Sequence, residues 1–143
     1  MPHDKLKLLC FDETDYEGIY EDIQEEYPDL IVEHVMTADE GFERLCSKDY
    51  DFVTTKILID PVCGLEIANI IKRNPTIYGT PAVAVLSELN IPRLESYVTK
   101  KLNTIYIYGV NRNFGEIYAE IDAFISTHLF EKQLQKMVWG QGE

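Results

Sequence analysis

Five short apolar segments, each followed by a stretch with helical periodicity, constrain the fold of this chain more than any other feature. The segments are strand-sized and fall at residues 6–11, 30–35, 52–59, 82–86 and 104–108. After the first of them, Tyr16, Ile19 and Ile23 recur at the spacing of one helix face, and apolar residues form a similar stripe over 114–129. Strands that alternate with helices through short connections predict a parallel sheet covered on both faces.

Local signals indicate where the helices begin and end. Thr37 and Glu40 have the spacing of a capping box, in which each side chain satisfies a free backbone N–H at a helix start. A third helix is predicted over 63–73, because Asn74 and Pro75 are typical of a helix end. A fourth is predicted over 92–98, with Pro92 in its first turn.

Length and charge exclude several classes of protein. The 143 residues fit one domain, and no apolar run is long enough to span a bilayer. The chain opens without a signal segment, so we expect a cytoplasmic protein with no membrane partner. The net charge is −12, and thirteen acidic residues but no lysine or arginine lie between Asp12 and Glu43. Such a field repels nucleic acid, which we exclude as a partner.

Motifs for catalysis are missing from the sequence. It contains no Walker loop, no GxGxxG and no GxSxG. Cys10, Cys46 and Cys63 form no CxxC pair, so we expect reduced, buried thiols and no disulfide framework. We therefore expect no enzyme and no bound cofactor, with one reservation for Mg²⁺.

That reservation concerns the end of the first predicted strand. Open parallel sheets place their functional residues at the carboxyl ends of the strands, and Asp12 and Glu13 follow the first strand directly. Adjacent carboxylates can supply the oxygen ligands of Mg²⁺. Acidic residues also open many helices merely to complement the helix dipole, so the pair alone does not decide between these roles.

Three stretches of the sequence resemble the receiver domains of response regulators, the CheY-like superfamily. Residues 37–45 are similar to the family's second helix, and residues 50–53 with 64–67 are similar to its third strand and following helix. The resemblance covers residues 5–128 and implies a single-domain α/β fold of the flavodoxin type. This fold is a doubly wound (βα)5 unit with five parallel strands in the order 2-1-3-4-5. We expect a receiver-like domain over 1–128 and a C-terminal helix extension or tail over 129–143.

The resemblance also identifies where this chain departs from the family pattern. In receivers the third strand ends in an aspartate that accepts a phosphoryl group, and the alignment without gaps places Lys56 there. Ser87 matches the switch hydroxyl and Tyr106 the switch aromatic, whereas Gly109 replaces the lysine of the fifth strand. An ammonium group cannot carry an acyl phosphate. The resemblance therefore implies a pseudo-receiver that acts in two-component signal transduction by protein–protein contact.

Two hypotheses follow for the chemistry of this site. In the first, Lys56 forms an ion pair with Asp12, Glu13 or both and takes the place of a metal; otherwise Lys56 simply extends into solvent. In the second, Asp60 is the phosphoacceptor of a working phosphorelay receiver, with Mg²⁺ bound by Asp12 and Glu13. The second hypothesis needs a change of register and a shorter loop before Gly64.

Surfaces must carry the function if catalysis is absent. Receivers commonly dock partners, or a second copy, through the face made by helix four, strand five and helix five. We therefore expect other signalling proteins, an output domain or a homodimer at this face. The residues assigned to it are Tyr97, Lys100, Lys101, Tyr106, Tyr108, Arg112 and Tyr118.

The last predicted helix is longer than the receiver pattern requires. Beyond Leu129, an apolar pattern of helical spacing continues through Phe130, Leu134 and Met137 to Trp139. This extension is expected to cover a partner, to pair with its own copy, to connect to an output domain or to be a simple tail.

Overall fold

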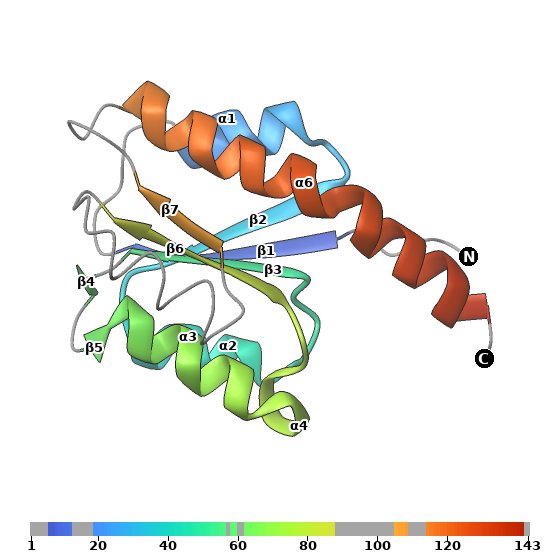
Figure 1. Cartoon of the computed structure of the whole chain (residues 1–143), viewed down its shortest axis with the longest axis horizontal. Coiled ribbons are helices and arrows are strands. Elements are labelled where there is room, and N and C mark those ends of the chain that lie inside the picture. The colour runs from blue at the N-terminus through green and yellow to red at the C-terminus, as the bar shows by residue number, and fades with distance from the viewer. Residues whose placement is uncertain are drawn as a thin grey trace.

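The chain folds into three layers around one parallel sheet (Figure 1). The computed structural model describes residues 6–12, 19–56, 58–59, 62–87, 105–108 and 114–141. Helices α1 (Ile19–Glu26) and α6 (Phe114–Gln141) cover one face of the sheet. Helices α2 (Ala38–Leu45) and α3 (Gly64–Arg73) cover the other.

The sheet has the order β2-β1-β3-β6-β7, and its strands all pair in parallel. Its strands are β1 (Leu6–Phe11), β2 (Leu30–Val35), β3 (Phe52–Lys56), β6 (Ala82–Ser87) and β7 (Ile105–Tyr108), the last described by its backbone alone. The inner strand β1 is buried on both faces, as parallel strands between helix layers are. The predicted α/β class with a parallel sheet is confirmed.

The predicted end of the third strand is wrong. Strand β3 ends at Lys56 and not at residue 59, because an antiparallel pair, β4 (Leu58–Ile59) and β5 (Val62–Cys63), follows it. Asn74 does end α3, but Pro75 starts the short helix α4 (Pro75–Tyr78), where its missing N–H costs nothing. The helix predicted at 92–98 lies outside the described residues.

The capping box before α2 forms only in part. The Thr37 hydroxyl accepts a hydrogen bond from the Glu40 backbone N–H at 3.2 Å, as predicted. The Glu40 carboxylate instead accepts from Arg44 Nη2, also at 3.2 Å, one turn along the helix. Arg44 also bonds Glu33 of β2 at 3.0 Å, so α2 is fixed to the sheet by this charged pair.

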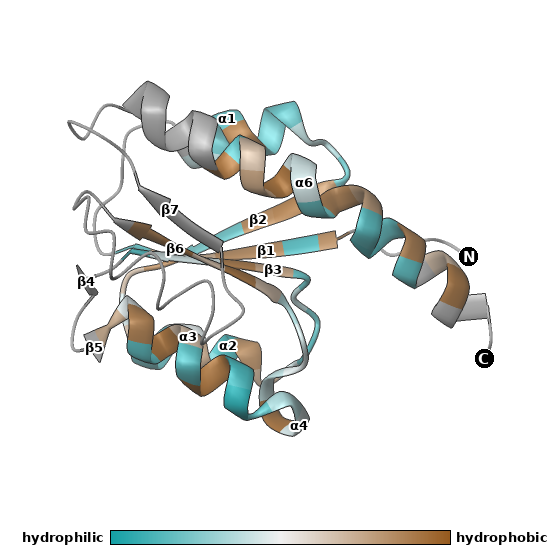
Figure 2. Cartoon of the chain, in the orientation of Figure 1, coloured by the Kyte–Doolittle hydropathy of each residue, from teal (hydrophilic) through white to brown (hydrophobic). Residues whose placement is uncertain are grey.

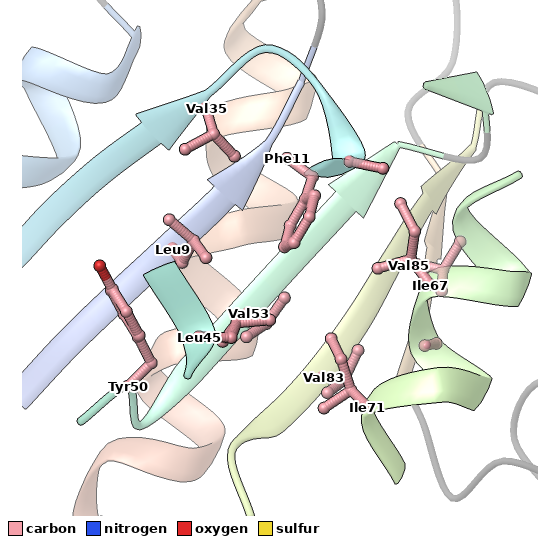
Figure 3. Close-up of a cluster of buried hydrophobic side chains, with 12 residues drawn as sticks. Leu9, Phe11, Val35, Leu45, Tyr50, Val53, Ile67, Ile71, Val83 and Val85 are labelled. Atoms are coloured by element: carbon pink, nitrogen blue, oxygen red, sulfur yellow. The ribbon is translucent and has the colours of Figure 1, made fainter. Parts of the chain in front are cut away.

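Each face of the sheet buries its own apolar cluster. Odd-numbered positions of β1 and β3 point toward α2 and α3, and Figure 3 shows their side chains filling that layer. Even-numbered positions point toward α1 and α6. The first cluster contains Leu9, Phe11, Val35, Leu45, Val53, Ile67, Ile71, Val83 and Val85. The second contains Leu8, Cys10, Tyr20, Ile23, Phe52, Ala84, Ile121, Phe124 and Ile125.

The hydroxyl of Tyr27 joins α1 to α6. It donates to the Asp122 carboxylate and lies 3.0 Å from Ser126 Oγ. Burial and the hydrogen bond to Asp122 raise the pKa of Tyr27 to about 12, so it remains a donor at neutral pH. The position of α6 on the sheet is therefore set by both apolar burial and a polar link to α1.

Two expectations about the whole chain can be checked on the described part. The cysteines are unpaired, but only Cys10 is buried, whereas Cys46 is exposed and Cys63 is half-buried. The prediction of buried thiols is therefore wrong for Cys46. Among the helices within the described ranges, none has the length and apolarity needed to cross a membrane.

We predict that Gly41→Ala lowers the free energy of unfolding by about 1–3 kcal/mol. A Cβ at Gly41 would overlap the buried Phe11 ring, and overpacking outweighs the gain of about 1 kcal/mol in helix propensity. Urea unfolding of Gly41→Ala, Phe11→Leu and the double variant measures the coupling. Because leucine makes room for the methyl group, the double variant should be more stable than the sum of the two changes predicts; additive losses would contradict this packing.

Candidate functional site

The register of β1 against β3 brings the first acidic residue and the unusual lysine to one edge of the sheet. Four residue pairs align the strands in parallel, from Leu8 with Phe52 to Phe11 with Thr55. The next residues along the two strands are Asp12 and Lys56. Because paired residues of parallel strands share a level, both lie at the carboxyl end of the sheet, where open α/β folds place their sites.

Asp12 is buried and held from several directions. Its side chain is 1% exposed, and the Tyr20 hydroxyl donates to Asp12 Oδ2 at 2.6 Å. Its backbone N–H donates to the Val35 carbonyl at 3.0 Å, and its own carbonyl accepts from His34 Nε2 at 2.6 Å. The Tyr20 bond therefore holds the carboxylate, and the other two bonds hold the backbone of Asp12.

Tyr20 and His34 form a single aromatic unit over Asp12. Their rings stack with centroids 4.8 Å apart and an angle of 24° between their planes. Because the carbonyl of Asp12 can only accept, the contact at 2.6 Å requires the His34 tautomer that carries its proton on Nε2. Helix α1 and strand β2 are thus both connected to the end of β1.

Below Asp12, the Cys10 thiol is kept protonated. Burial is the main cause that raises the pKa of Cys10 to about 12; a hydrogen bond with Thr54 lowers it, and the nearby Asp12 charge contributes a smaller increase. A thiol with this pKa is not a nucleophile at neutral pH. The buried cysteine at this edge therefore has a packing role.

Lys56 ends β3 with its side chain half-buried. Its partner across β6 is Leu86, which packs against the core cluster beneath α1 and α6. Ser87 comes one residue later and pairs with Tyr108, while Tyr106 pairs with Val85. The β6 residue level with Lys56 is therefore apolar. Ser87, matched to the switch hydroxyl, lies one residue beyond that level, and Tyr106, matched to the switch aromatic, lies one residue before it.

Most of the other predicted site residues are not described, or only by their backbone. Glu13, Asp60 and Gly109 lie outside the described residues, and so do Tyr97, Lys100, Lys101 and Arg112 of the interaction face. Ser87, Tyr106, Tyr108 and Tyr118 are described as backbone positions within β6, β7 and α6.

Tyr20 and His34 were missed as site residues by the sequence. Tyr20 lies next to Ile19 in the first predicted helix, and no pattern in the sequence indicates a role for His34. Each side chain is largely an aromatic ring with one or two polar atoms, and each lies on an element that was predicted from its apolar pattern. No spacing rule relates them to Asp12, since they meet only when α1 and β2 pack beside β1.

Within the part of the chain that is described, no group of three His, Cys, Asp or Glu side chains is placed to hold a metal ion. Asp12 supplies a carboxylate at this edge, but Lys56 brings a positive charge to the neighbouring strand end. Mg²⁺ takes oxygen ligands, and an ammonium group both fails to bind it and repels it. The described residues at this edge therefore fit a metal poorly.

Comparison with known proteins identifies the fold. No protein-family model and no curated protein matches the chain. The signal receiver domain of a putative Luxo repressor protein from Vibrio parahaemolyticus superposes with a TM-score of 0.75 and 13% identity, covering 94% of this chain and 97% of that one.

Two further solved structures agree with this result. The phosphorylated cyanobacterial phytochrome response regulator RcpA has a TM-score of 0.70 and 18% identity, with 87% of this chain and 94% of that one covered. The response regulator domain of Thermotoga maritima CheB has a TM-score of 0.65 and 16% identity, with 86% and 95% covered. The chain therefore has the fold of receiver domains, as the sequence resemblance implied.

We predict that Tyr20→Phe destabilises the protein by about 1–2 kcal/mol, because a buried carboxylate oxygen of Asp12 loses its donor. The matched control is Tyr78→Phe, since the Tyr78 ring packs against Phe42 and no hydrogen bond of its hydroxyl occurs among the described contacts. Urea unfolding of both variants gives the comparison. Equal losses for the two variants would show that the Tyr20–Asp12 bond contributes nothing.

Proposed function

We propose that this chain is a pseudo-receiver, which acts in signal transduction through contacts with other proteins and does not accept a phosphoryl group in the ordinary way. The observation that carries the proposal is Lys56 as the last residue of β3, level with Asp12 at the carboxyl edge of a receiver fold. Other signalling proteins or an output domain would then respond to the folded surface and not to a phosphorylated aspartate.

The end of β3 supports the alignment on which this proposal depends. The competing reading needs Asp60 as the acid at the end of this strand. Strand β3 ends four residues earlier, at Lys56, and the segment around Asp60 contributes to a separate strand pair, β4 with β5. A shift of Asp60 into the place of Lys56 would require unpairing these residues and pulling β3 out of register with both β1 and β6.

Charge at the edge of the sheet supports the same reading. In the receiver pattern, an acidic cluster is balanced by Mg²⁺ and by a lysine after the fifth strand. Here that lysine is Gly109, and a lysine stands at the end of β3 instead. We propose that the Lys56 ammonium balances the buried Asp12 carboxylate, so that the site holds a fixed positive charge without a metal. Such a pair would hold the site in one charge state without phosphorylation.

We predict that acetyl phosphate with Mg²⁺ leaves the protein unmodified. A phosphorylated receiver gains the mass of one phosphoryl group in intact mass spectrometry, and a receiver domain with its aspartate, treated in parallel, serves as the positive control. An aspartyl-phosphate adduct that disappears in Asp60→Asn would contradict the proposal and assign the acceptor to Asp60.

We predict that Lys56→Ala lowers the free energy of unfolding by about 1–3 kcal/mol, because removing one partner leaves a buried charge poorly compensated. Lys56→Arg keeps the charge and should be much closer to the native protein. The variants Lys56→Ala, Asp12→Asn and their combination form a double-mutant cycle in urea unfolding. Additivity in this cycle, or tight Mg²⁺ binding by the native protein in calorimetry, would contradict the ion pair.

A further inference from the structure

Helix α6 is much longer than the face of the sheet it covers. Its first half packs on the sheet through Ile121, Phe124 and Ile125, which are at most 2% exposed, and Leu129 is the last residue to join that cluster. The helix continues to Gln141 and projects beyond the sheet (Figure 1). Beyond Leu129, Lys132 Nζ still donates to the Thr80 carbonyl at 3.0 Å, but among the described residues no later side chain of α6 joins the core cluster.

The projecting turns carry large apolar side chains in contact with solvent. Phe130 is 72% exposed, Leu134 45%, Met137 61% and Val138 56%. Figure 2 shows apolar bands in this part of α6. Scattered exposed apolar residues need no explanation, but four within nine positions of one helix do.

These residues form one stripe, on the side of the helix away from the sheet. With 3.6 residues per turn, all four fall within an arc of about 100°, which is the width of a packing face. The centre of this arc lies about 150° around the helix from the face that packs on the sheet. The exposed residues Ala123 and Thr127 fall in the same arc, so the stripe also runs along the half of α6 that is fixed to the body.

Spacing along the stripe indicates what kind of surface fits it. Ala123, Thr127, Phe130, Leu134 and Met137 follow one another at intervals of four, three, four and three residues. This is the heptad spacing by which one helix packs side chains between those of another. A helix of similar pattern therefore fits the stripe better than a flat surface does.

Charge favours a second copy of this chain as the source of that helix. The chain as a whole carries −12, so two copies repel each other over most of their surface. Residues 130–141 contain one glutamate and two lysines, Glu131, Lys132 and Lys136, for a net charge of +1. The stripe thus lies on a segment where two acidic copies can approach without mutual repulsion.

We propose that two copies of the chain dimerise through this stripe, with the projecting ends of α6 packed antiparallel. An antiparallel pair places the two acidic bodies at opposite ends of about 18 Å of helix. That separation is more than twice the screening length of about 8 Å at physiological salt. The projecting turns continue a helix that is already packed on the sheet. Dimer formation therefore does not carry the free-energy cost of nucleating a new helix.

The proposal predicts a monomer–dimer equilibrium that Leu134 controls. Sedimentation velocity over roughly a hundredfold range of concentration should show a shift to dimer with increasing concentration. Leu134→Glu should weaken the dimer by at least about tenfold without changing the circular dichroism spectrum or the melting temperature, because the side chain is already exposed in the monomer.

A matched control separates this stripe from exposed apolar residues in general. Ile77 on α4 is 46% exposed, against 45% for Leu134, so Ile77→Glu removes a comparable surface elsewhere and should leave the dimer intact. Met137→Glu gives a second test if Leu134→Glu lowers the melting temperature. A native chain that stays monomeric over the whole range, or a dimer that Leu134→Glu and Met137→Glu leave unchanged, would overturn the proposal.

Two further outcomes would overturn the proposal, one by assigning the stripe to a lipid surface and one by reversing the orientation of the paired helices. Sedimentation of a monomeric chain with phospholipid vesicles, lost in Leu134→Glu, would assign it to a lipid surface and overturn the dimer. Cysteines introduced at positions 130 and 137 test the orientation of the paired helices. If position 130 crosslinks to position 130 of the other copy more readily than to position 137, the antiparallel arrangement is overturned. None of these results depends on Lys56, so the dimer and the proposed pseudo-receiver function succeed or fail separately.

Discussion

The parallel pairing of β1 with β3 is the contact on which the rest of this structure depends. It sends odd positions toward α2 and α3 and even positions toward α1 and α6, so one register decides the membership of both cores. A slip by one residue would exchange the two faces. The same register places Asp12 level with Lys56, and therefore an error in pairing would destroy the core and the site together.

The site at that edge is held by contacts from three elements. Asp12 directly follows β1, Tyr20 belongs to α1 and His34 to β2, and their hydrogen bonds and stacking connect all three elements. The Asp12 carboxylate is buried and accepts a hydrogen bond from the Tyr20 hydroxyl, so packing of α1 beside β1 determines its surroundings.

The carboxyl edge of the sheet and the projecting end of α6 differ in the kind of surface they present. The carboxyl edge of the sheet concentrates charge, and the projecting end of α6 concentrates exposed apolar surface on a nearly neutral segment. In an acidic protein this separation favours association through the apolar surface, because electrostatic repulsion is weak where the local net charge is low. Signal transduction by protein contact would then depend on surfaces and not on a reaction.

The sequence alone determined the α/β class and the parallel sheet, because apolar periods of strands and helices are local properties of the chain. It also identified Asp12, which follows the first predicted strand, whereas Lys56 was identified by the resemblance to receivers. It placed the end of β3 three residues too late, because Leu58 and Ile59 are as apolar as a strand interior and only their pairing with β5 separates them. Only the tertiary structure decided that Tyr20 and His34 belong to the site and that α6 is apolar on its outer side. Both facts depend on which face of an element meets its neighbours, and this is decided when the elements pack together.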